Sequence, residues 1–166
     1  MFEIGSYVVY GSTGICKIED INTLDMPGAT SDRLYYIMSS IRNNGNRVFL
    51  PVDNTKVVLR PVMDEKSANE LIGRIENIPE IVADNDKVRE EQYKEFSKGC
   101  DCEKWVAIIK TVTTRKKERF AQGKKVTATD ERYFRLAGEH LYSELAFVLG
   151  KEITEIETLI NNKITV

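Results

Sequence analysis

The first sixty residues carry the two-residue alternation of apolar and polar positions that is typical of half-buried β-strands. The alternation is clearest over residues 15–21, and shorter β-rich runs occupy residues 7–10, 34–38 and 47–50. Residues 43–46 read Asn-Asn-Gly-Asn, a turn sequence that predicts a hairpin between the last two runs. Four or five short strands in such a short segment predict a small, strongly bent sheet or barrel.

From Asp64 onward the apolar positions recur at the three- and four-residue spacing of amphipathic helices. Asp64 is the expected N-cap of the first helix, and Gly99 and Gly150 are expected to end two later helices. Thr127, with Asp130 three residues further on, resembles an acidic variant of the capping box. The predicted helices follow Asp64 and then cover residues 87–98, 102 to about 121, 127 to about 149, and a short segment opened by Thr154 and Glu157.

The change of period near residues 60–66 divides the chain into two domains. We predict an α+β fold in which residues 1–63 form the small β-domain and residues 64–166 form an all-α domain. Trp105 lies on a helical stripe of apolar residues, so we interpret it as a core residue of the second domain.

Positive and negative charges nearly balance when they are summed over the chain. Lys and Arg total 24 against 26 Asp and Glu, which gives a net charge of −2. This balance argues against a freestanding DNA-binding protein, but it leaves open a basic patch that acts once a partner has delivered it to DNA. Because no apolar run is long enough to span a bilayer and the start does not resemble a signal peptide, we expect a cytoplasmic protein without membrane contact.

Catalytic and metal-binding motifs are not recognisable in the sequence. His140 is the single histidine, and it lies among apolar neighbours on a predicted helix. Cys100 and Cys102 can supply two thiolates, but a closed metal site needs two more ligands, and Cys16 belongs to the other predicted domain. Neither a phosphate-binding loop nor a nucleophile elbow is present. We therefore predict a protein that is not an enzyme and holds no metal or cofactor.

The densest basic segment runs from Arg115 to Lys125. It holds six basic residues and one acidic residue in eleven positions, at the end of one predicted helix and in the loop that follows. One interpretation is a solvated helix end whose cations complement the helix macrodipole. The other is a patch that contacts phosphates and releases their counterions.

Several short motifs follow one another in a particular order. Residues 2–10 read Phe-Glu-Ile-Gly-Ser-Tyr-Val-Val-Tyr with Gly14 shortly after, and residues 48–54 read Val-Phe-Leu-Pro-Val-Asp-Asn after Tyr-Tyr-Ile at 35–37. Residues 119–146 combine a helix end, a basic loop and a long helix that finishes in Ser-Glu-Leu-Ala. In this order and spacing the chain resembles the CarD/CdnL family of transcription regulators, whose N-terminal module is shared with the transcription-repair coupling factor.

The resemblance implies a Tudor-like N-terminal domain that binds the β subunit of RNA polymerase through an exposed strand edge. The matching strand covers residues 47–50, where Arg47 and Phe49 should face away from the core and are the stronger candidates for the interface. The further candidates are Val48 and Leu50, for which core packing is the alternative, and Tyr36 and Met38 on the neighbouring strand.

For the helical domain the resemblance implies contact with promoter DNA near the upstream edge of the melted region, largely independent of sequence. Such contact stabilises the open complex. The best-studied family members carry a tryptophan wedge before the second basic helix, whereas residues 84–89 here contain no aromatic residue, although Asn85 can still reach a base edge. The candidates for DNA contact are Asn85, Lys87, Arg89, Arg115, Lys116, Arg119, Lys124 and Lys125.

The sequence thus favours a transcription regulator that acts through RNA polymerase and promoter DNA together, associated with the nucleoid through the polymerase. The alternative is a protein–protein adaptor on RNA polymerase that makes no direct DNA contact. An exposed strand edge can also pair with itself, so a monomer and a domain-swapped dimer both stay open.

Overall fold

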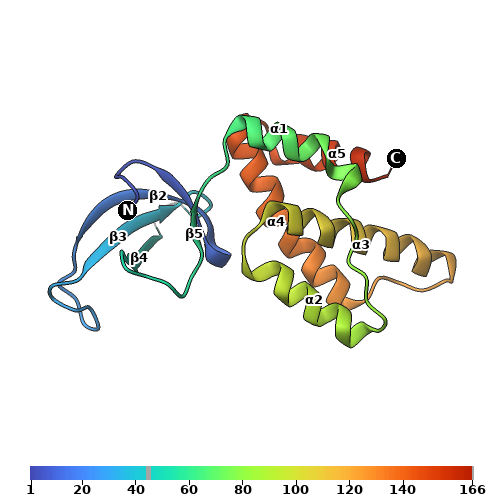
Figure 1. Ribbon diagram of the computed structural model, residues 1–166, viewed down its shortest axis with the longest axis horizontal. Coiled ribbons are helices and arrows are strands. Elements are labelled where there is room, and N and C mark those ends of the chain that lie inside the picture. Colours follow the sequence, from blue (N-terminus) through green and yellow to red (C-terminus); the bar gives the residue numbers. More distant parts are fainter. Residues whose placement is uncertain (44–45, 166) are drawn as a thin grey trace. The chain divides into compact units, whose positions relative to one another are not determined.

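The computed structural model describes residues 1–43 and 46–165, which form a β-sheet unit followed by a helical unit (Figure 1). The chain divides into two compact units, Met1–Val62 and Met63–Val166. The α+β fold class that the sequence predicts is confirmed. The Asn-Gly pair of the expected hairpin turn lies outside the described residues, but beside it the Asn46 N–H donates to the Asn43 carbonyl at 3.0 Å.

The described residues of the N-terminal unit form a five-stranded antiparallel sheet, in the strand order β4-β3-β2-β1-β5. A bulge between Ile18 and Asp20 interrupts the register of β2 and β3, and such a bulge bends and twists the strand that carries it. The elements are β1 (Tyr7–Tyr10), the 3-10 turn η1 (Gly11–Thr13), β2 (Gly14–Thr23), β3 (Leu34–Ser40), β4 (Arg47–Pro51) and β5 (Leu59–Pro61).

One face of this sheet forms the core of the unit. Alternate residues of the strands meet there, as the two-residue period predicts. Phe2 packs edge-on against Tyr36, and the Phe2 N–H donates to the Tyr36 hydroxyl at 2.9 Å, which ties the start of the chain to β3. The fully buried members of this core are Val8, Cys16, Ile18, Tyr36, Met38 and Leu50.

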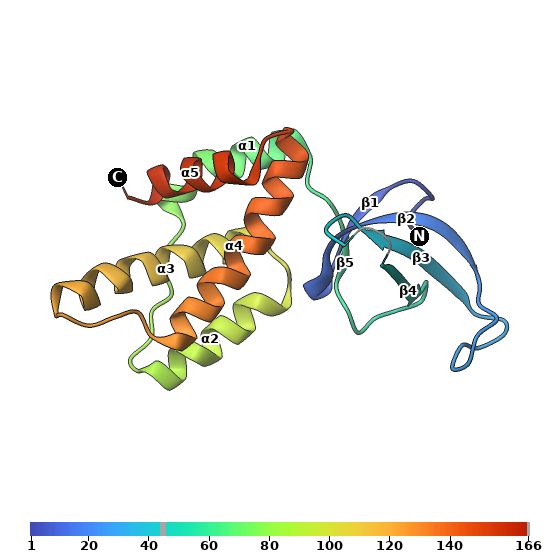
Figure 2. The same ribbon diagram turned by 180° about the vertical axis from the view of Figure 1, so that it is seen from behind.

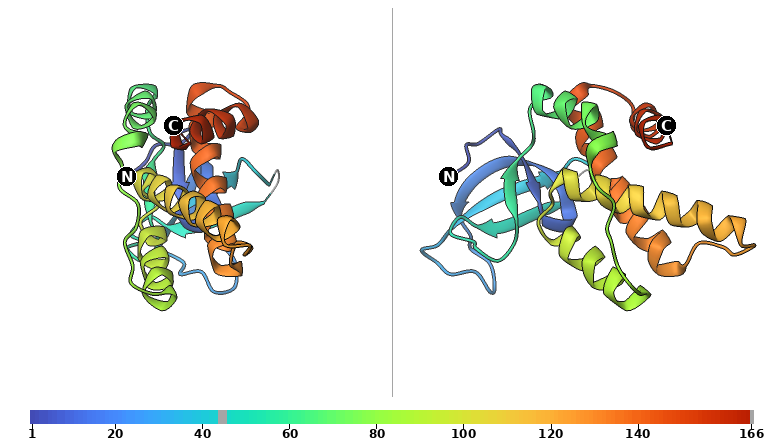
Figure 3. Two further views of the ribbon diagram at one scale, coloured as in Figure 1. Left: turned by 90° about the vertical axis from the view of Figure 1, so that its right-hand side faces the viewer. Right: turned by 45° about the vertical axis from the view of Figure 1, so that its right-hand side comes forward.

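In the C-terminal unit, α3 and α4 pack against each other, and α2 lies on the opposite side of α3 from α1 and α5 (Figures 2 and 3). Trp105 is 2% exposed and stacks on the His140 ring with 4.9 Å between centroids, so its interpretation as a core residue is confirmed. The elements are α1 (Glu65–Gly73), the 3-10 turn η2 (Ile75–Asn77), α2 (Asp86–Lys98), α3 (Cys102–Ala121), α4 (Ala128–Leu149) and α5 (Ile153–Ile164).

Side-chain caps set most of the helix starts. Asp64 accepts the Ser67 N–H at 2.7 Å, as expected of an N-cap, and Thr127 accepts the Asp130 N–H at 3.1 Å. The expectation for the last helix was wrong, because α5 begins after Glu152 and Thr154 lies inside it.

The helix ends differ in one detail from expectation. Gly150 adopts the left-handed conformation that commonly ends a helix, with a φ of 63°. Gly99 ends α2 as its C-cap, as expected, but it keeps a φ of −89°, and the left-handed residue after α2 is Cys100, with a φ of 53°.

Asp130 does not complete a capping box. Its carboxylate instead accepts the Tyr93 hydroxyl at 2.8 Å and the Arg115 Nε–H at 2.8 Å. Tyr93 and Asp130 are 0% and 2% exposed, so this buried contact joins α2, α3 and α4. Burial raises the pKa of Tyr93, and the hydrogen bond to Asp130 raises it further, which keeps the hydroxyl protonated as a donor.

No helix in the described part of the chain is long and apolar enough to cross a membrane. The three cysteines are free and buried. Burial raises the pKa of the Cys16 thiol to about 11, so the thiol stays protonated and unreactive at neutral pH.

Replacing Asp130 with alanine should lower the free energy of unfolding by about 3–5 kcal/mol, because the largely buried Arg115 charge loses its nearest partner and the Tyr93 hydroxyl loses its acceptor. Tyr93→Phe is the matched control. This variant removes the hydrogen bond to Asp130 but leaves the ion pair between Arg115 and Asp130, so the free energy of unfolding should fall by only about 1–3 kcal/mol. Urea unfolding followed by circular dichroism measures both. Equal losses in the two variants would contradict a central role for Asp130.

Candidate functional site

Strand β4 lies at one edge of the sheet. Within the described residues it pairs with β3 alone, in a register that places Met38 opposite Val48 and Tyr36 opposite Leu50. The other edge strand, β5, has only three residues and ends in Pro61, which has no N–H to offer. Strand β4 therefore presents the longer edge.

The hydrogen bonds that flank β4 show which of its main-chain groups point outward. The Ser40 N–H donates to the Asn46 carbonyl at 3.4 Å, and the Val52 N–H donates to the Leu34 carbonyl at 3.0 Å. In an antiparallel pair, hydrogen-bonded and non-bonded residues alternate. Residues 46, 48, 50 and 52 therefore face β3, whereas residues 47, 49 and 51 turn their main-chain groups away from it.

The outward main-chain groups belong to Arg47, Phe49 and Pro51. In the described part of the chain, neither Arg47 nor Phe49 makes a main-chain hydrogen bond outside the ladder with β3. Pro51 has no N–H, and its carbonyl already accepts the Asn54 N–H at 3.0 Å. The open edge thus offers the N–H and carbonyl groups of Arg47 and Phe49, two donors and two acceptors in the alternating pattern that a further strand needs.

The side chains of Arg47 and Phe49 share the face of the sheet that is turned away from the core. Both are exposed, Phe49 to 38%. Ile37 lies directly opposite Phe49 on β3 and is half-buried, so the two form a small apolar surface beside the open edge. Ile37 was not among the residues predicted from the sequence, and only the strand register reveals it.

Three of the six side chains expected at the polymerase interface are buried in this structure. Tyr36, Met38 and Leu50 are 2%, 0% and 4% exposed and belong to the core of the sheet unit. Val48 is half-buried and packs against the same core. The cause is the two-residue period, because residues 48 and 50 necessarily face opposite to residues 47 and 49.

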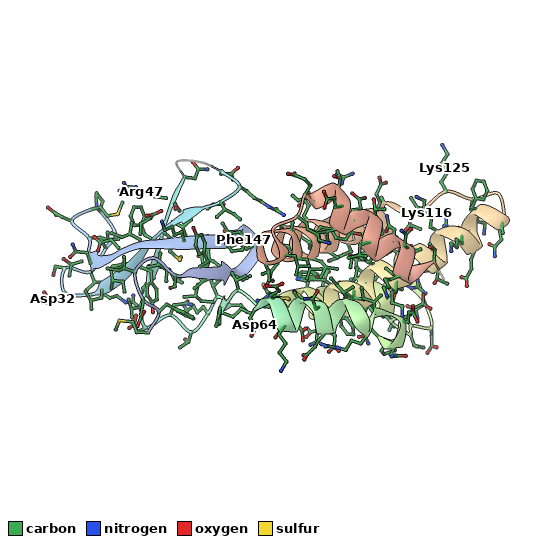
Figure 4. All side chains as sticks on the ribbon, turned by 90° about the horizontal axis from the view of Figure 1, so that it is seen from above. Asp32, Arg47, Asp64, Lys116, Lys125 and Phe147 are labelled. Atoms are coloured by element: carbon green, nitrogen blue, oxygen red, sulfur yellow. The ribbon has the colours of Figure 1, made fainter. Side chains whose placement is uncertain are left out.

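Four of the eight residues predicted to contact DNA present free cations. Lys87, Lys116, Lys124 and Lys125 are exposed, and their side chains make no hydrogen bond or ion pair with any other described residue. Figure 4 shows Lys116 and Lys125 toward the end of the helical unit where α3 passes into α4. Their ammonium groups are available to an anion from outside.

Two of the predicted arginines are engaged inside the protein. The Arg115 side chain is 19% exposed and lies 2.8 Å from Asp130 and 3.6 Å from Asp86. The Arg89 side chain is 13% exposed and bonds to Asp86 at 2.7 Å. Burial lowers the pKa of Arg115, but the hydrogen bond and the charge of Asp130 outweigh burial and raise it, so this guanidinium stays charged.

The remaining two residues hold the ends of helices. Asn85 is the N-cap of α2, and its side-chain oxygen accepts the Val88 N–H at 2.9 Å. Arg119 donates from Nε to the Lys125 carbonyl at 2.7 Å, while its own carbonyl accepts the Lys124 N–H at 2.8 Å. These bonds fix the turn after α3, so Arg119 positions the two lysines that follow it.

Comparison with known families identifies the sheet unit. Residues 2–63 match the model of the CarD-like/TRCF RID domain. The N-terminal unit belongs to this family. The RID domain is a non-catalytic RNA polymerase-interacting domain, so the protein is an RNA polymerase-interacting factor. No curated protein matches the chain.

The match to the RID domain ends where the helical unit begins. The open edge of β4 and the surface formed by Phe49 and Ile37 therefore lie within the matched segment, whereas the free lysines lie outside it. The family match therefore bears on the surface at β4 and does not bear on the free lysines of the helical unit.

Proposed function

We propose that the protein is a bacterial transcription regulator that binds the RNA polymerase β subunit and contacts promoter DNA near the upstream edge of the melted region. The observation that carries the proposal is the open edge of β4 within the RID domain. Acting in this way, the protein works in the cytoplasm, at the nucleoid.

The RID domain binds by adding the edge strand of its partner to its own sheet. Arg47 and Phe49 exchange main-chain hydrogen bonds with that strand, and each such bond contributes about 0.5–1.5 kcal/mol net. Phe49 and Ile37 add apolar contact on one side of the new ladder, and Arg47 adds a cation. The main chain supplies affinity, and these side chains supply specificity.

The helical unit contacts DNA through lysines rather than through base-reading side chains. Lys87, Lys116, Lys124 and Lys125 are exposed and unpaired within the described residues, and ammonium groups of this kind hold phosphates without reading sequence. A chain with a net charge of −2 binds DNA weakly by itself. Once the RID domain is bound to polymerase, the helical unit meets nearby DNA at a high effective concentration.

This contact acts on promoter melting as a shift of population. A protein that binds the open complex more tightly than the closed one stabilises the open complex by the difference between the two binding free energies. A difference of about 1.4 kcal/mol changes the ratio of open to closed complexes tenfold. A few phosphate contacts made only in the open complex are enough for such an effect.

The adaptor alternative is favoured by a separate observation on the helical unit. A groove of about 270 Å³ is lined by Ile78, Pro79 and Phe96 among others, and a protein segment can bind in such a groove. The adaptor uses the same open edge but needs none of the free lysines, so the two functions respond differently to lysine substitutions.

Replacing Phe49 with proline should weaken binding to the isolated polymerase β lobe more than Phe49→Ala does. Both variants lose the ring, but only proline also loses the outward N–H. The expected difference is about 2- to 12-fold in the dissociation constant, which is the range for one hydrogen bond. Titration calorimetry or biolayer interferometry measures it.

Thermal unfolding of the two Phe49 variants provides the control. Their midpoints should be similar, because the residue 49 N–H takes no part in the ladder with β3. Val48→Pro should unfold at a lower temperature, because it removes a bond within that ladder. Equal β-lobe affinities of Phe49→Pro and Phe49→Ala, with both folded, would contradict strand addition at β4.

Reversing the charges of Lys124 and Lys125 to glutamate should shorten the lifetime of the open promoter complex while leaving binding to the β lobe unchanged. The plot of log lifetime against log salt should flatten by about 2, because each lost phosphate contact removes roughly 0.9 from the slope. Competitor-challenge assays with polymerase and promoter DNA measure both quantities.

The control for this charge reversal is Lys66→Glu with Lys151→Glu. This double variant changes the net charge by the same amount as the Lys124 and Lys125 variant. Lys151 follows the C-terminal end of α4, whereas Lys124 and Lys125 precede its N-terminal end, and the 22 residues of the helix separate these ends by about 33 Å. Unchanged lifetimes in the Lys124 and Lys125 variant would reject DNA contact at this surface and favour the adaptor.

A further inference from the structure

Phe120 is the most exposed aromatic residue in the described part of the chain. Its side chain is 82% exposed, whereas the next aromatic residues, Tyr7 and Phe147, reach only 39%. It lies in the last turn of α3, which ends at Ala121. An isolated phenyl ring in water gains nothing from the fold, so any contact that buries it lies outside the described residues of this chain.

Exposed lysines precede and follow Phe120 in the sequence, on the last turns of α3 and in the turn after it. Lys116 and Lys117 lie four and three residues before Phe120 on α3, a spacing that places them on the same side of the helix. The Gly123 N–H donates to the Phe120 carbonyl at 3.0 Å, and this turn brings Lys124 and Lys125 directly after the ring. All four lysines are exposed.

This combination fits an unpaired nucleobase better than a protein surface. A protein contact centres on several apolar residues packed together. Among described residues 110–127, Phe120 is the only large apolar side chain that is exposed. Proteins that bind single-stranded nucleic acid combine an aromatic ring, on which a base stacks, with cations that follow the phosphates.

We propose that Phe120 stacks on an unpaired base of single-stranded DNA while Lys116, Lys117, Lys124 and Lys125 hold the flanking phosphates. The inference rests on the proposed function, since promoter melting supplies unpaired bases to the helical unit. A base stacked on Phe120 cannot pair, so the contact favours the open complex over the closed one. Every base has a π face, so the contact does not depend on sequence.

The test compares two single strands that carry equal phosphate charge. The full-length protein is titrated into fluorescently labelled oligo-dT and into an abasic oligonucleotide of the same length, and anisotropy is followed at low salt. Phe120→Ala, Phe120→Leu and Phe120→Trp are measured beside the natural protein. Thermal unfolding checks each variant, and an exposed position such as 120 should leave the midpoint unchanged.

The natural protein should bind oligo-dT more tightly than the abasic strand. Phe120→Ala should lose about 5- to 150-fold of affinity for oligo-dT, the range for one stacked base, with no change for the abasic strand. Phe120→Leu should not restore binding, because it keeps apolar area but has no ring. Phe120→Trp should restore binding, and its emission should be quenched by oligo-dT, whereas Trp105 is buried and should not respond.

Equal affinities of the natural protein for the two strands, or no binding to either, would overturn the inference. So would a Phe120→Ala variant that keeps its preference for oligo-dT, or one that instead loses affinity for polymerase, which would make the ring a protein contact. The proposed function is judged separately by the Lys124 and Lys125 variant on promoter complexes. A shortened lifetime there, together with an unaffected Phe120→Ala, leaves the function standing and removes only the stacking.

Discussion

The main-chain groups of β4 alternate between two directions, and the open edge of the sheet depends on this alternation. Residues 48 and 50 saturate the ladder with β3, and residues 47 and 49 therefore direct their N–H and carbonyl groups away from it. An unpaired edge is a hazard that proteins usually cover or disrupt. Here it lies within a domain whose family interacts with RNA polymerase, and we propose that the same feature that invites aggregation serves recognition.

The basic residues at the end of α3 and in the turn after it divide into two groups with different tasks. Arg115 and Arg119 bond within the protein and fix α3, α4 and the turn between them. Lys124 and Lys125 are exposed beside this fixed turn. The planar guanidinium suits Arg115 and Arg119 to this task, because it makes several oriented bonds at once.

Periodicity predicted the elements of the fold well, because strands and helices impose their periods directly on the sequence. It could not predict how side chains share partners. Asp130 matched a capping box, but the buried Tyr93 and Arg115 compete for its carboxylate and bind it. Periodicity likewise could not show that Ile37 lies opposite Phe49, because the register between strands decides which residues lie beside each other at an edge.

Amide hydrogen exchange at β4 tests the central claim most directly. In the free protein the amides of Arg47 and Phe49 should exchange quickly and those of Val48 and Leu50 slowly, because only the latter bond to β3. Binding of the polymerase β lobe should slow exchange at Arg47 and Phe49. Tight binding that leaves both amides exchanging as in the free protein would contradict the account.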